Sequence, residues 1–228
     1  MHVALIPDGN RRWARKRNLP PWQGHFAGAK NLEKILKKAF DLKIECFTVW
    51  GCSVDNLTKR DPKEVKFLFK IFENYFKRLL KEKRIEKERV KISFFGEWKK
   101  YLPKTLKEVI AKLIFKTKNY QKWFLNFLMA YDGKREMMSA IKKIVQKGVK
   151  KVDEKTILEN LWTGKLPPVD LVIRTGTEGD PHNSAGFMMW QTAYSQFYFT
   201  KTYFPSFSPE EFEKAINDFL KRERRFGK

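Results

Sequence analysis

Short apolar runs alternate with longer amphipathic stretches along the chain, and this alternation predicts an α/β fold. We expect strands at residues 3–6, 46–51, 90–95, 123–130 and 171–174, with a short sixth strand near 197–200. Helices fill the intervals between them. The pattern therefore predicts a central, mostly parallel, six-stranded sheet flanked by helices on both faces.

Two helix starts carry complete sequence signals. Asp61 and Ser208 each stand before a proline and three residues ahead of a glutamate. An N-cap side chain, a proline at the first helical position and a glutamate at the third are typical of a helix with a capping box. No repeat and no low-complexity linker interrupts the sequence, so we expect a single domain over residues 1–228.

The helix expected after Asp61 is apolar over more than one stripe. Its apolar residues are Val65, Leu68, Phe69, Ile71, Phe72, Tyr75, Phe76, Leu79 and Leu80. Such a face is typical of a helix buried on two sides. Two interpretations remain open. Either the helix packs between the sheet and another helix, or it forms one wall of an apolar tunnel or groove.

The first strand runs into a turn with the layout of a diphosphate-binding site. Gly9 permits a tight turn, and Asn10 is a good N-cap for a helix that starts at Arg11. Free amides at that helix start, together with Arg11 and Arg12, form a seat for an anion. A carboxylate such as Asp8 repels a phosphate unless a divalent cation such as Mg²⁺ lies between them. The alternative is an ordinary strand-to-helix junction with solvated arginines.

Two more polar loops follow predicted strands. Asn56 and Arg60 lie in the loop after residues 46–51, and Arg174 ends the strand at 171–174. Ligands of an open parallel sheet bind outside the carboxyl ends of its strands, so these loops should open on the same edge as Asp8. The sequence therefore predicts one site for two anionic groups and a metal.

The charge of the chain narrows the choice of partners. The 228 residues carry a net charge of +22, which predicts attraction to nucleic acid, acidic lipid surfaces or phosphorylated substrates. Lysines and arginines are spread through the whole sequence, and neither a Cys/His ligand set nor an aromatic-rich RNA-binding motif occurs. We therefore expect no nucleic-acid partner.

Both cysteines, Cys46 and Cys52, fall in one predicted strand. Six steps of about 3.3 Å place them roughly 20 Å apart, too far for a disulfide. Reduced thiols, no signal peptide and no apolar run of membrane-spanning length predict a soluble, cytoplasmic protein. Its basic surface would still allow peripheral contact with a membrane.

The polar loops belong to a longer series of ordered motifs. The series opens with the block His-Val-Ala-Leu-Ile-Pro-Asp-Gly-Asn-Arg-Arg-Trp-Ala at residues 2–14. It continues through residues 24–28, 53–56, 130–134, 169–176, 190–194 and 198–200, and it closes at 222–227. Over nearly the whole chain these motifs resemble those of the cis-prenyltransferases, the family of undecaprenyl diphosphate synthase and dehydrodolichyl diphosphate synthase.

The resemblance implies a homodimer of α/β subunits, each with an apolar tunnel between the sheet and its helices. It implies Mg²⁺-dependent transfer of an allylic prenyl diphosphate, a farnesyl- or geranylgeranyl-type primer, onto isopentenyl diphosphate with cis geometry. The product would be a polyprenyl diphosphate, a lipid-carrier precursor. The alternatives are a short-chain or branching prenyl diphosphate synthase and a non-catalytic subunit of this family.

The resemblance also implies roles for single residues. Asp8 would hold Mg²⁺, and the catalytic residues would be Asp8, Asn10, Ser53 and Asn56. The substrates would be bound by Gly9, Asn10, Arg11, Arg12, Trp13, His25, Ser53, Asn56, Arg60, Arg174, His182 and Ser184. For His25 a simple helix hydrogen bond is the alternative, and the family's arginine after Asn56 corresponds to Lys59 or Arg60. Arg225-Phe226-Gly227 fits a tail motif that completes the partner subunit's site in related enzymes.

The chain departs from the family pattern at residues 178–187. The usual Arg-x-Ser-Asn is absent, and the longer loop instead offers His182, Asn183 or Ser184 to the second diphosphate. His182 can equally be a plain loop residue.

Three further positions bear on the metal, the primer and the product. Gln196 stands where the family has a second metal carboxylate, so Glu178 or Asp180 would have to compensate for it. Pro20-Pro21-Trp22 replaces a basic residue on the primer side. The sequence leaves primer and product length open. The candidates for a shortened tunnel, or for ordinary core, are Phe69, Phe72, Phe76 and Phe127.

Overall fold

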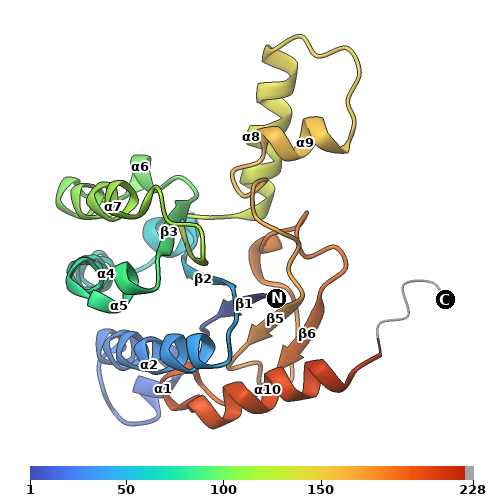
Figure 1. The fold of residues 1–228 in the computed structure, drawn as a ribbon. Coiled ribbons are helices and arrows are strands. Elements are labelled where there is room, and N and C mark those ends of the chain that lie inside the picture. Colours follow the sequence, from blue (N-terminus) through green and yellow to red (C-terminus); the bar gives the residue numbers. More distant parts are fainter. Residues whose placement is uncertain (224–228) are drawn as a thin grey trace.

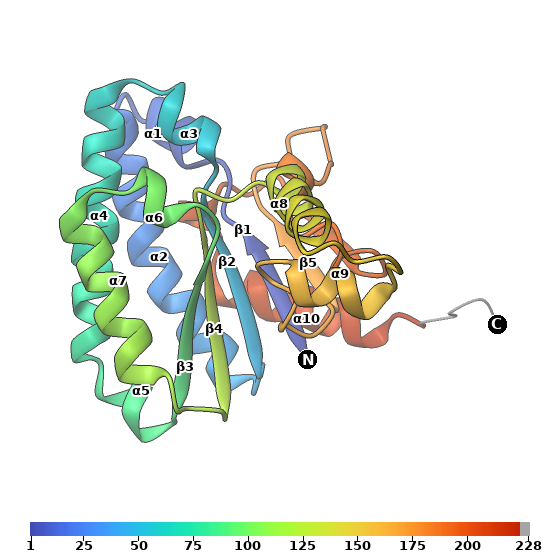
Figure 2. The same cartoon turned by 90° about the horizontal axis from the view of Figure 1, so that it is seen from above.

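The computed structural model describes residues 1–223, and its centre is a six-stranded sheet (Figures 1 and 2). The strand order is β3-β4-β2-β1-β5-β6, and every neighbouring pair is parallel. The strands are β1 (His2–Ile6), β2 (Cys46–Cys52), β3 (Val90–Phe95), β4 (Trp123–Met129), β5 (Leu171–Arg174) and β6 (Gln196–Phe199). All six predicted strands are therefore confirmed, each to within one residue at either end.

The helices follow the strands in alternation, as the pattern predicts. They are α1 (Asn10–Arg15), α2 (Pro21–Asp41), α3 (Val54–Thr58), α4 (Pro62–Lys81), α5 (Lys83–Lys87), α6 (Trp98–Tyr101), α7 (Lys104–Thr117), α8 (Gly133–Gln146), α9 (Glu154–Asn160) and α10 (Pro209–Lys221). Two short 3₁₀ turns, η1 (Ser184–Gly186) and η2 (Phe204–Ser206), lie near the ends of β5 and β6 in sequence. Within residues 1–223 no helix is long and apolar enough to cross a membrane.

The two faces of the sheet are covered unequally. On one face, Val3 and Leu5 of β1 point into a large core that α2, α4, α7 and α10 complete (Figure 2). On the other face, Ala4 and Ile6 join a small core with Tyr131, Phe187 and Met188, among others. The alternation along β1 is the two-residue period of a strand, and both sets are fully apolar because both faces are buried.

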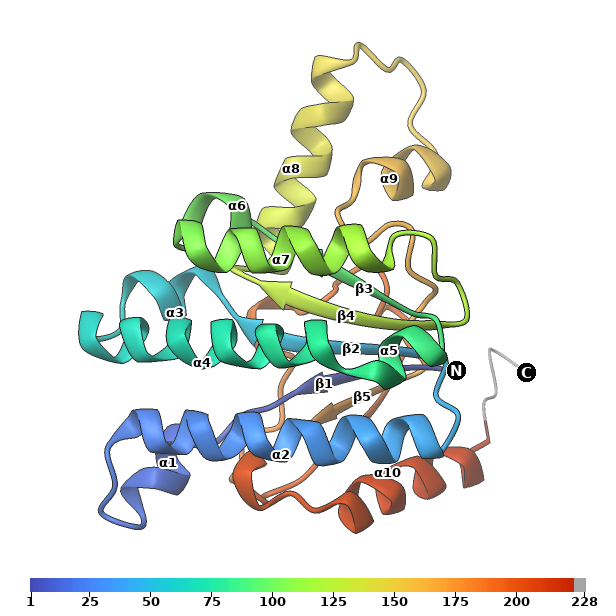
Figure 3. The same cartoon turned by 60° about the vertical axis from the view of Figure 1, so that its left-hand side comes forward.

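Helix α8 projects away from the body of the molecule, with α9 beside it (Figures 1 and 3). Its base is anchored by Glu136, a buried carboxylate that accepts hydrogen bonds from the Tyr131 hydroxyl and from the backbone and side chain of Thr163. Farther out, Met138, Ile141 and Val145 are exposed. Their spacing places three apolar side chains along one side of the projecting helix.

The two predicted capping boxes have different outcomes. Ser208 and Glu211 form the reciprocal box at the start of α10, which confirms that prediction. At the start of α4 the Asp61 side chain accepts from the amides of Lys63 and Glu64, but the Glu64 carboxylate turns into the protein. That capping box was wrongly predicted, because stronger ionic partners compete for Glu64.

The predicted N-cap at Asn10 is also wrong. Helix α1 includes Asn10, and Gly9 precedes it with φ 95°, a left-handed conformation that favours glycine. The Asn10 side chain instead donates from Nδ2 to the Pro7 carbonyl, at 2.8 Å.

Candidate active site

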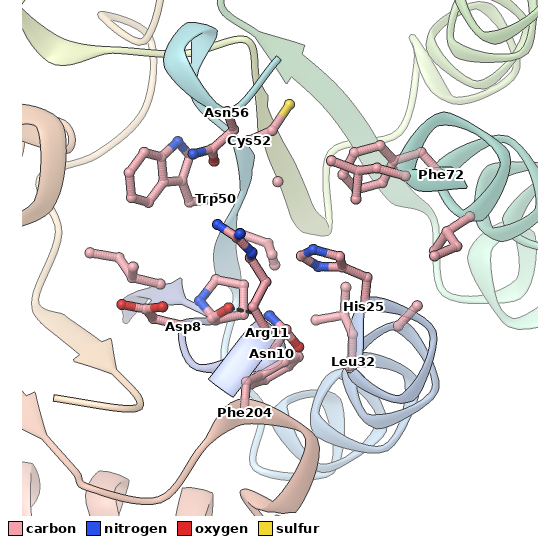
Figure 4. A pocket seen from close by; sticks show the side chains of 18 of the residues that line it. Asp8, Asn10, Arg11, His25, Leu32, Trp50, Cys52, Asn56, Phe72 and Phe204 are labelled. Atoms are coloured by element: carbon pink, nitrogen blue, oxygen red, sulfur yellow. Dashed lines mark hydrogen bonds between the residues drawn. The ribbon is translucent and has the colours of Figure 1, made fainter. Parts of the chain in front are cut away.

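The three polar loops meet at the carboxyl edge of β1, β2 and β5. Ile6 pairs with Arg174 and Leu5 with Val49, so the segments that follow these strands open on one edge. A cavity of about 390 Å³ opens there, between this edge and helices α1, α2 and α4 (Figure 4). Its polar mouth is lined by Asp8, Gly9, Asn10, Arg11, Arg12, Arg15, His25, Asn56, Arg60 and Ser184. The shared edge predicted from the sequence is confirmed.

Asp8 lies between two arginines at this mouth. Its carboxylate accepts from the Gly9 amide at 2.6 Å and lies 3.3 Å from Arg12 Nη2 and 3.0 Å from Arg174 Nη2. Arg174 is buried, while the Asp8 side chain is 39% exposed. The carboxylate is therefore fixed in position and still open on the cavity side.

The backbone of Asp8 is held independently of its side chain. Its carbonyl accepts from the Thr175 hydroxyl at 2.8 Å and from the Phe204 amide at 3.0 Å. A side chain at Gly9 would meet Tyr203 at 2.5 Å, so Tyr203 closes the outer side of the turn. These contacts set the turn before any ligand arrives.

Glu64 gathers three basic side chains on the opposite side of the mouth. Its carboxylate lies 3.5 Å from Arg11 Nε, 3.1 Å from His25 Nε2 and 3.4 Å from Arg60 Nη1. Glu64 is 5% exposed, and the hydrogen bond with His25, helped by Arg11 and Arg60, lowers the pKa of its carboxyl. Burial lowers the pKa of Arg60, and the nearby negative charge of Glu64 partly offsets this shift.

The sequence reasoning missed this role of Glu64. A signal was present, because Glu64, Leu68, Ile71 and Tyr75 follow one helical stripe, and an acid on an apolar stripe needs a buried partner. His25 lines the cavity and bonds to Glu64 on another helix, so it is more than a local helix hydrogen-bonder.

Ser53 and Asn56 support each other at the start of α3. Ser53 Oγ accepts from the Asn56 amide at 3.0 Å, and Asn56 Oδ1 accepts from the Ser53 amide at 3.3 Å. Asn56 lines the cavity, whereas Ser53 is buried behind it. The box therefore uses the acceptor atoms of both side chains, and the Asn56 amide nitrogen has no hydrogen-bond partner within the described part of the chain.

Four predicted substrate ligands do not line the cavity: Trp13, Ser53, Arg174 and His182. Trp13 donates from Nε1 to Ser206 Oγ at 2.8 Å and does not line the cavity. The His182 imidazole is exposed and lies 3.1 Å from the Asp180 carboxylate. Arg174 instead donates to the backbone carbonyl of His182, so this residue shapes the site through its main chain. From the same loop, Ser184 lines the cavity.

The candidates for a second metal carboxylate do not meet Asp8. Gln196 pairs with Leu171 at the start of β5, so it lies at the edge of the sheet opposite to Arg174. Its side-chain oxygen accepts a hydrogen bond from Arg222. Glu178 is engaged by Arg12, Lys16 and Tyr203. Within residues 1–223, no three His, Cys, Asp or Glu side chains form a metal-binding set. The tail motif at 225–227 lies outside the described residues.

This donor set still fits Mg²⁺ in one way. Mg²⁺ in proteins is commonly held by one or two carboxylates together with substrate phosphates and water. Asp8, half exposed at an anion-binding mouth, can supply that single carboxylate. A metal here would depend on the diphosphate for its other ligands.

The inner part of the cavity is apolar. It is lined by Leu32, Val49, Leu68, Ile71, Phe72, Tyr75, Phe76 and Phe127, among others, so α4 both packs in the core and walls a cavity. Of the predicted tunnel candidates, Phe69 does not line it. The inner end is an aromatic cluster in which Phe127 lies 5.1 Å from Phe76 and 6.2 Å from Tyr75 between ring centroids.

Tyr75 also lines a second cavity, of about 340 Å³, towards the other end of the sheet. Leu36, Phe40, Phe47 and Trp123 belong to its walls. The Tyr75 hydroxyl is buried and has no hydrogen-bond partner among residues 1–223, and burial raises its pKa. Tyr75 therefore lines both the apolar inner end of the first cavity and the wall of the second.

A basic mouth above an apolar interior, at the carboxyl edge of a parallel α/β sheet, is the arrangement that a ligand such as a prenyl diphosphate, charged at one end and apolar at the other, fits. Residues 6–227 match the family described as "Putative undecaprenyl diphosphate synthase", and the chain belongs to this family. The predicted cis-prenyltransferase is thereby confirmed, and the chain is a prenyl diphosphate synthase by class.

Known relatives agree along the whole chain. The tritrans,polycis-undecaprenyl-diphosphate synthases (geranylgeranyl-diphosphate specific) of Pyrococcus furiosus and Pyrococcus horikoshii are 40% and 39% identical, over 100% of this chain and 86% of each relative. The crystal structure of lavandulyl diphosphate synthase from Lavandula x intermedia, in complex with dimethylallyl diphosphate, is similar with a TM-score of 0.91. It is 30% identical and covers 100% of this chain and 98% of the other.

Proposed function

We propose that this chain extends a geranylgeranyl-type allylic diphosphate by cis addition of isopentenyl diphosphate, making a polyprenyl diphosphate. The observation that carries the proposal is that one cavity combines a basic mouth around Asp8 with an apolar interior that ends at Tyr75. The names of the Pyrococcus relatives support the primer and the product class.

In this mechanism the mouth holds charge and the interior holds hydrocarbon. Arg11, Arg12, His25 and the amides at the start of α1 bind the primer diphosphate, and the prenyl chain enters the apolar cavity. As the allylic C–O bond breaks, negative charge grows on the diphosphate, so these fixed cations bind the transition state more strongly than the substrate. Mg²⁺, held by Asp8 and the diphosphate, would supply further positive charge to the leaving group.

The second substrate lies on the Arg174 side in this proposal. Ser184 lines the cavity and binds the isopentenyl diphosphate directly. Arg174 is buried beside Asp8, adds positive charge on this side, and shapes the chain at 178–187 through its hydrogen bond to the His182 carbonyl. New carbon–carbon bond formation ends with loss of a proton. The released diphosphate is the basic group that takes up this proton, and Asn10 and Asn56, which both line the cavity, orient the groups along its path.

Product analysis tests this function. The purified protein is incubated with Mg²⁺, isopentenyl diphosphate and, separately, dimethylallyl, farnesyl or geranylgeranyl diphosphate, and the products are sized. Long cis products from geranylgeranyl diphosphate are expected. A short or branched product from dimethylallyl diphosphate would favour a short-chain or branching prenyl diphosphate synthase. The similarity to lavandulyl diphosphate synthase and the altered 178–187 loop support this second candidate. No condensation with any primer would indicate a non-catalytic subunit.

Product length should depend on Tyr75. We expect Tyr75→Ala to join the two cavities and lengthen the products, because the chain then grows past the aromatic cluster. Tyr75→Phe is the matched control. It should leave the product length unchanged. It should also leave the free energy of unfolding unchanged or raise it by up to about 1 kcal/mol, because it removes a buried hydroxyl that has no partner among the described residues. Chromatography measures the product length of both variants, and urea unfolding measures their stability. Products of wild-type length from Tyr75→Ala would contradict this role.

We further propose a homodimer and peripheral contact with a membrane. The stripe of Met138, Ile141 and Val145 on the projecting α8 supports self-association through that helix. Ile141→Lys should convert the dimer to a monomer in light scattering, because a lysine buried at its centre loses its hydration. Phe115→Lys, at another exposed apolar position, is the control. A dimer that survives Ile141→Lys would place the interface elsewhere.

A further inference from the structure

Exposed aromatic side chains gather on the outer side of α2 and α4. Trp22 of α2 and Phe67 of α4 stack with ring centroids 4.9 Å apart and an interplanar angle of 13°. Phe26, one helical turn after Trp22, is 52% exposed, and Phe67 is 40% exposed. Single exposed apolar residues are common on proteins, but a stack that bridges two helices forms a continuous surface. We call Trp22, Phe26 and Phe67 the aromatic patch.

Lysines surround the aromatic patch. Lys30 Nζ lies 4.7 Å from the centre of the Phe26 ring, and Lys70 Nζ lies 5.9 Å from that of Phe67. Lys63 and Lys66 lie one turn or less before Phe67 on the same helix. Within the described part of the chain these four exposed lysines form no ion pair.

The acids of the same helices are already engaged. Glu33 pairs with Arg78 at 2.6 Å, and Glu73 pairs with Lys77. Glu64 is buried with its three basic partners, and Asp61 caps α4. The positive charge around the aromatic patch is therefore not neutralised locally.

The aromatic patch lies on the outer side of the helices that wall the cavity. Leu32 of α2 and Leu68 and Ile71 of α4 line its apolar interior, and His25, between Trp22 and Phe26, lines its mouth. Figure 3 shows α2 and α4 side by side over the sheet. A bilayer in contact with this surface would lie next to α2 and α4. A prenyl substrate or product could then pass between the bilayer and the cavity that these helices line.

We propose that the aromatic patch docks this protein on a membrane surface that carries anionic lipid. Aromatic rings with apolar bodies fit the boundary between headgroups and acyl chains, and lysines on the same surface bind lipid phosphates. A second copy of the chain is a poor occupant, because four unpaired lysines would face one another. This inference localises the peripheral membrane contact proposed above and does not depend on the chemistry of the site.

Vesicle flotation with the full chain tests the proposal. The net charge of +22 alone favours anionic vesicles, so the aromatic side chains are the decisive variable. Phe26→Ser combined with Phe67→Ser should lower partition into vesicles of equal phosphatidylcholine and phosphatidylglycerol by about tenfold or more, because inserted phenyl area is lost. The matched control is Phe115→Ser, since Phe115 of α7 is 70% exposed with Lys118 Nζ 4.2 Å from its ring centre.

The outcomes separate docking from net charge and from catalysis. Partition that is unchanged in the double variant, or lowered equally by Phe115→Ser, would overturn the proposal in favour of general charge. A shift of the double variant from dimer to monomer would assign the aromatic patch to self-association and also overturn it. Turnover of geranylgeranyl diphosphate in solution should be the same in all variants, because neither Phe26 nor Phe67 lines the cavity. A failure of docking therefore leaves the proposed reaction standing.

Discussion

Asp8→Ala is expected to lower turnover by about a thousandfold while the protein remains folded. The fold survives because the turn is held by its backbone, through the bonds from Thr175 and Phe204 to the Asp8 carbonyl. Arg12 keeps Glu178 as a partner, and Arg174 keeps the His182 carbonyl. The loss is therefore expected to fall on the chemistry, because Asp8 is the one carboxylate among residues 1–223 that lines the mouth, where we propose that it holds the metal.

The kinetic pattern distinguishes this role from simple binding. Removing a carboxylate makes the mouth more positive, so the KM values of both diphosphates should not rise, while kcat falls and the Mg²⁺ concentration needed for residual activity increases. Asp180→Ala provides a control, because Asp180 is an exposed acid whose partner is His182. Its activity should equal that of the wild type. Activity of Asp8→Ala within about tenfold of the wild type would remove Asp8 from the metal role.

The strands were predictable because parallel strands buried on both faces are almost continuously apolar. Cys46 and Cys52 were correctly expected to remain free, and both are buried thiols whose pKa is raised by burial, to about 12 and about 11. The common edge of the site followed from topology alone, since each polar loop comes directly after a strand. These features depend on local pattern and on one general rule for parallel sheets.

The errors arose where tertiary partners compete with local ones. Asn10 has the sequence context of an N-cap, yet the Pro7 carbonyl takes its amide. Glu64 has the context of a capping box, yet three basic groups from other segments take its carboxylate. The resemblance implies a metal carboxylate at Gln196 and leaves open what would replace it, and the register of Gln196 with Leu171 places it at the edge of the sheet away from Asp8. The apolar stripe around Glu64 indicates that it has a buried partner, but no local pattern identifies which residues from other segments supply it.

Glu64→Gln should show how much the site depends on that missed residue. The substitution keeps the shape and one acceptor but removes the charge that Arg11, His25 and Arg60 share. We expect the free energy of unfolding to fall by about 3 kcal/mol, because buried cations lose their counterion. Turnover should fall by about a hundredfold, because the side chains that we propose bind the primer diphosphate are no longer held in place.

The pH dependence of stability gives the sharper test. The pKa of the Glu64 carboxyl is lowered from 4.5 in the folded protein, so its contribution is fully present above pH 4.5. That contribution is lost as the pH falls through the lowered pKa. Urea unfolding should therefore show a full difference between wild type and Glu64→Gln at neutral pH that shrinks in acid.

Glu211→Gln is the matched control for Glu64→Gln. Glu211 occupies the same third position of a helix, but it completes its capping box and bonds with Thr202 instead of gathering basic residues. Its loss should cost about 1 kcal/mol or less and leave turnover unchanged. If the two variants were equally stable and equally active, the Glu64 carboxylate would be an ordinary cap-position residue, and the primer side of the mouth would be held by other contacts.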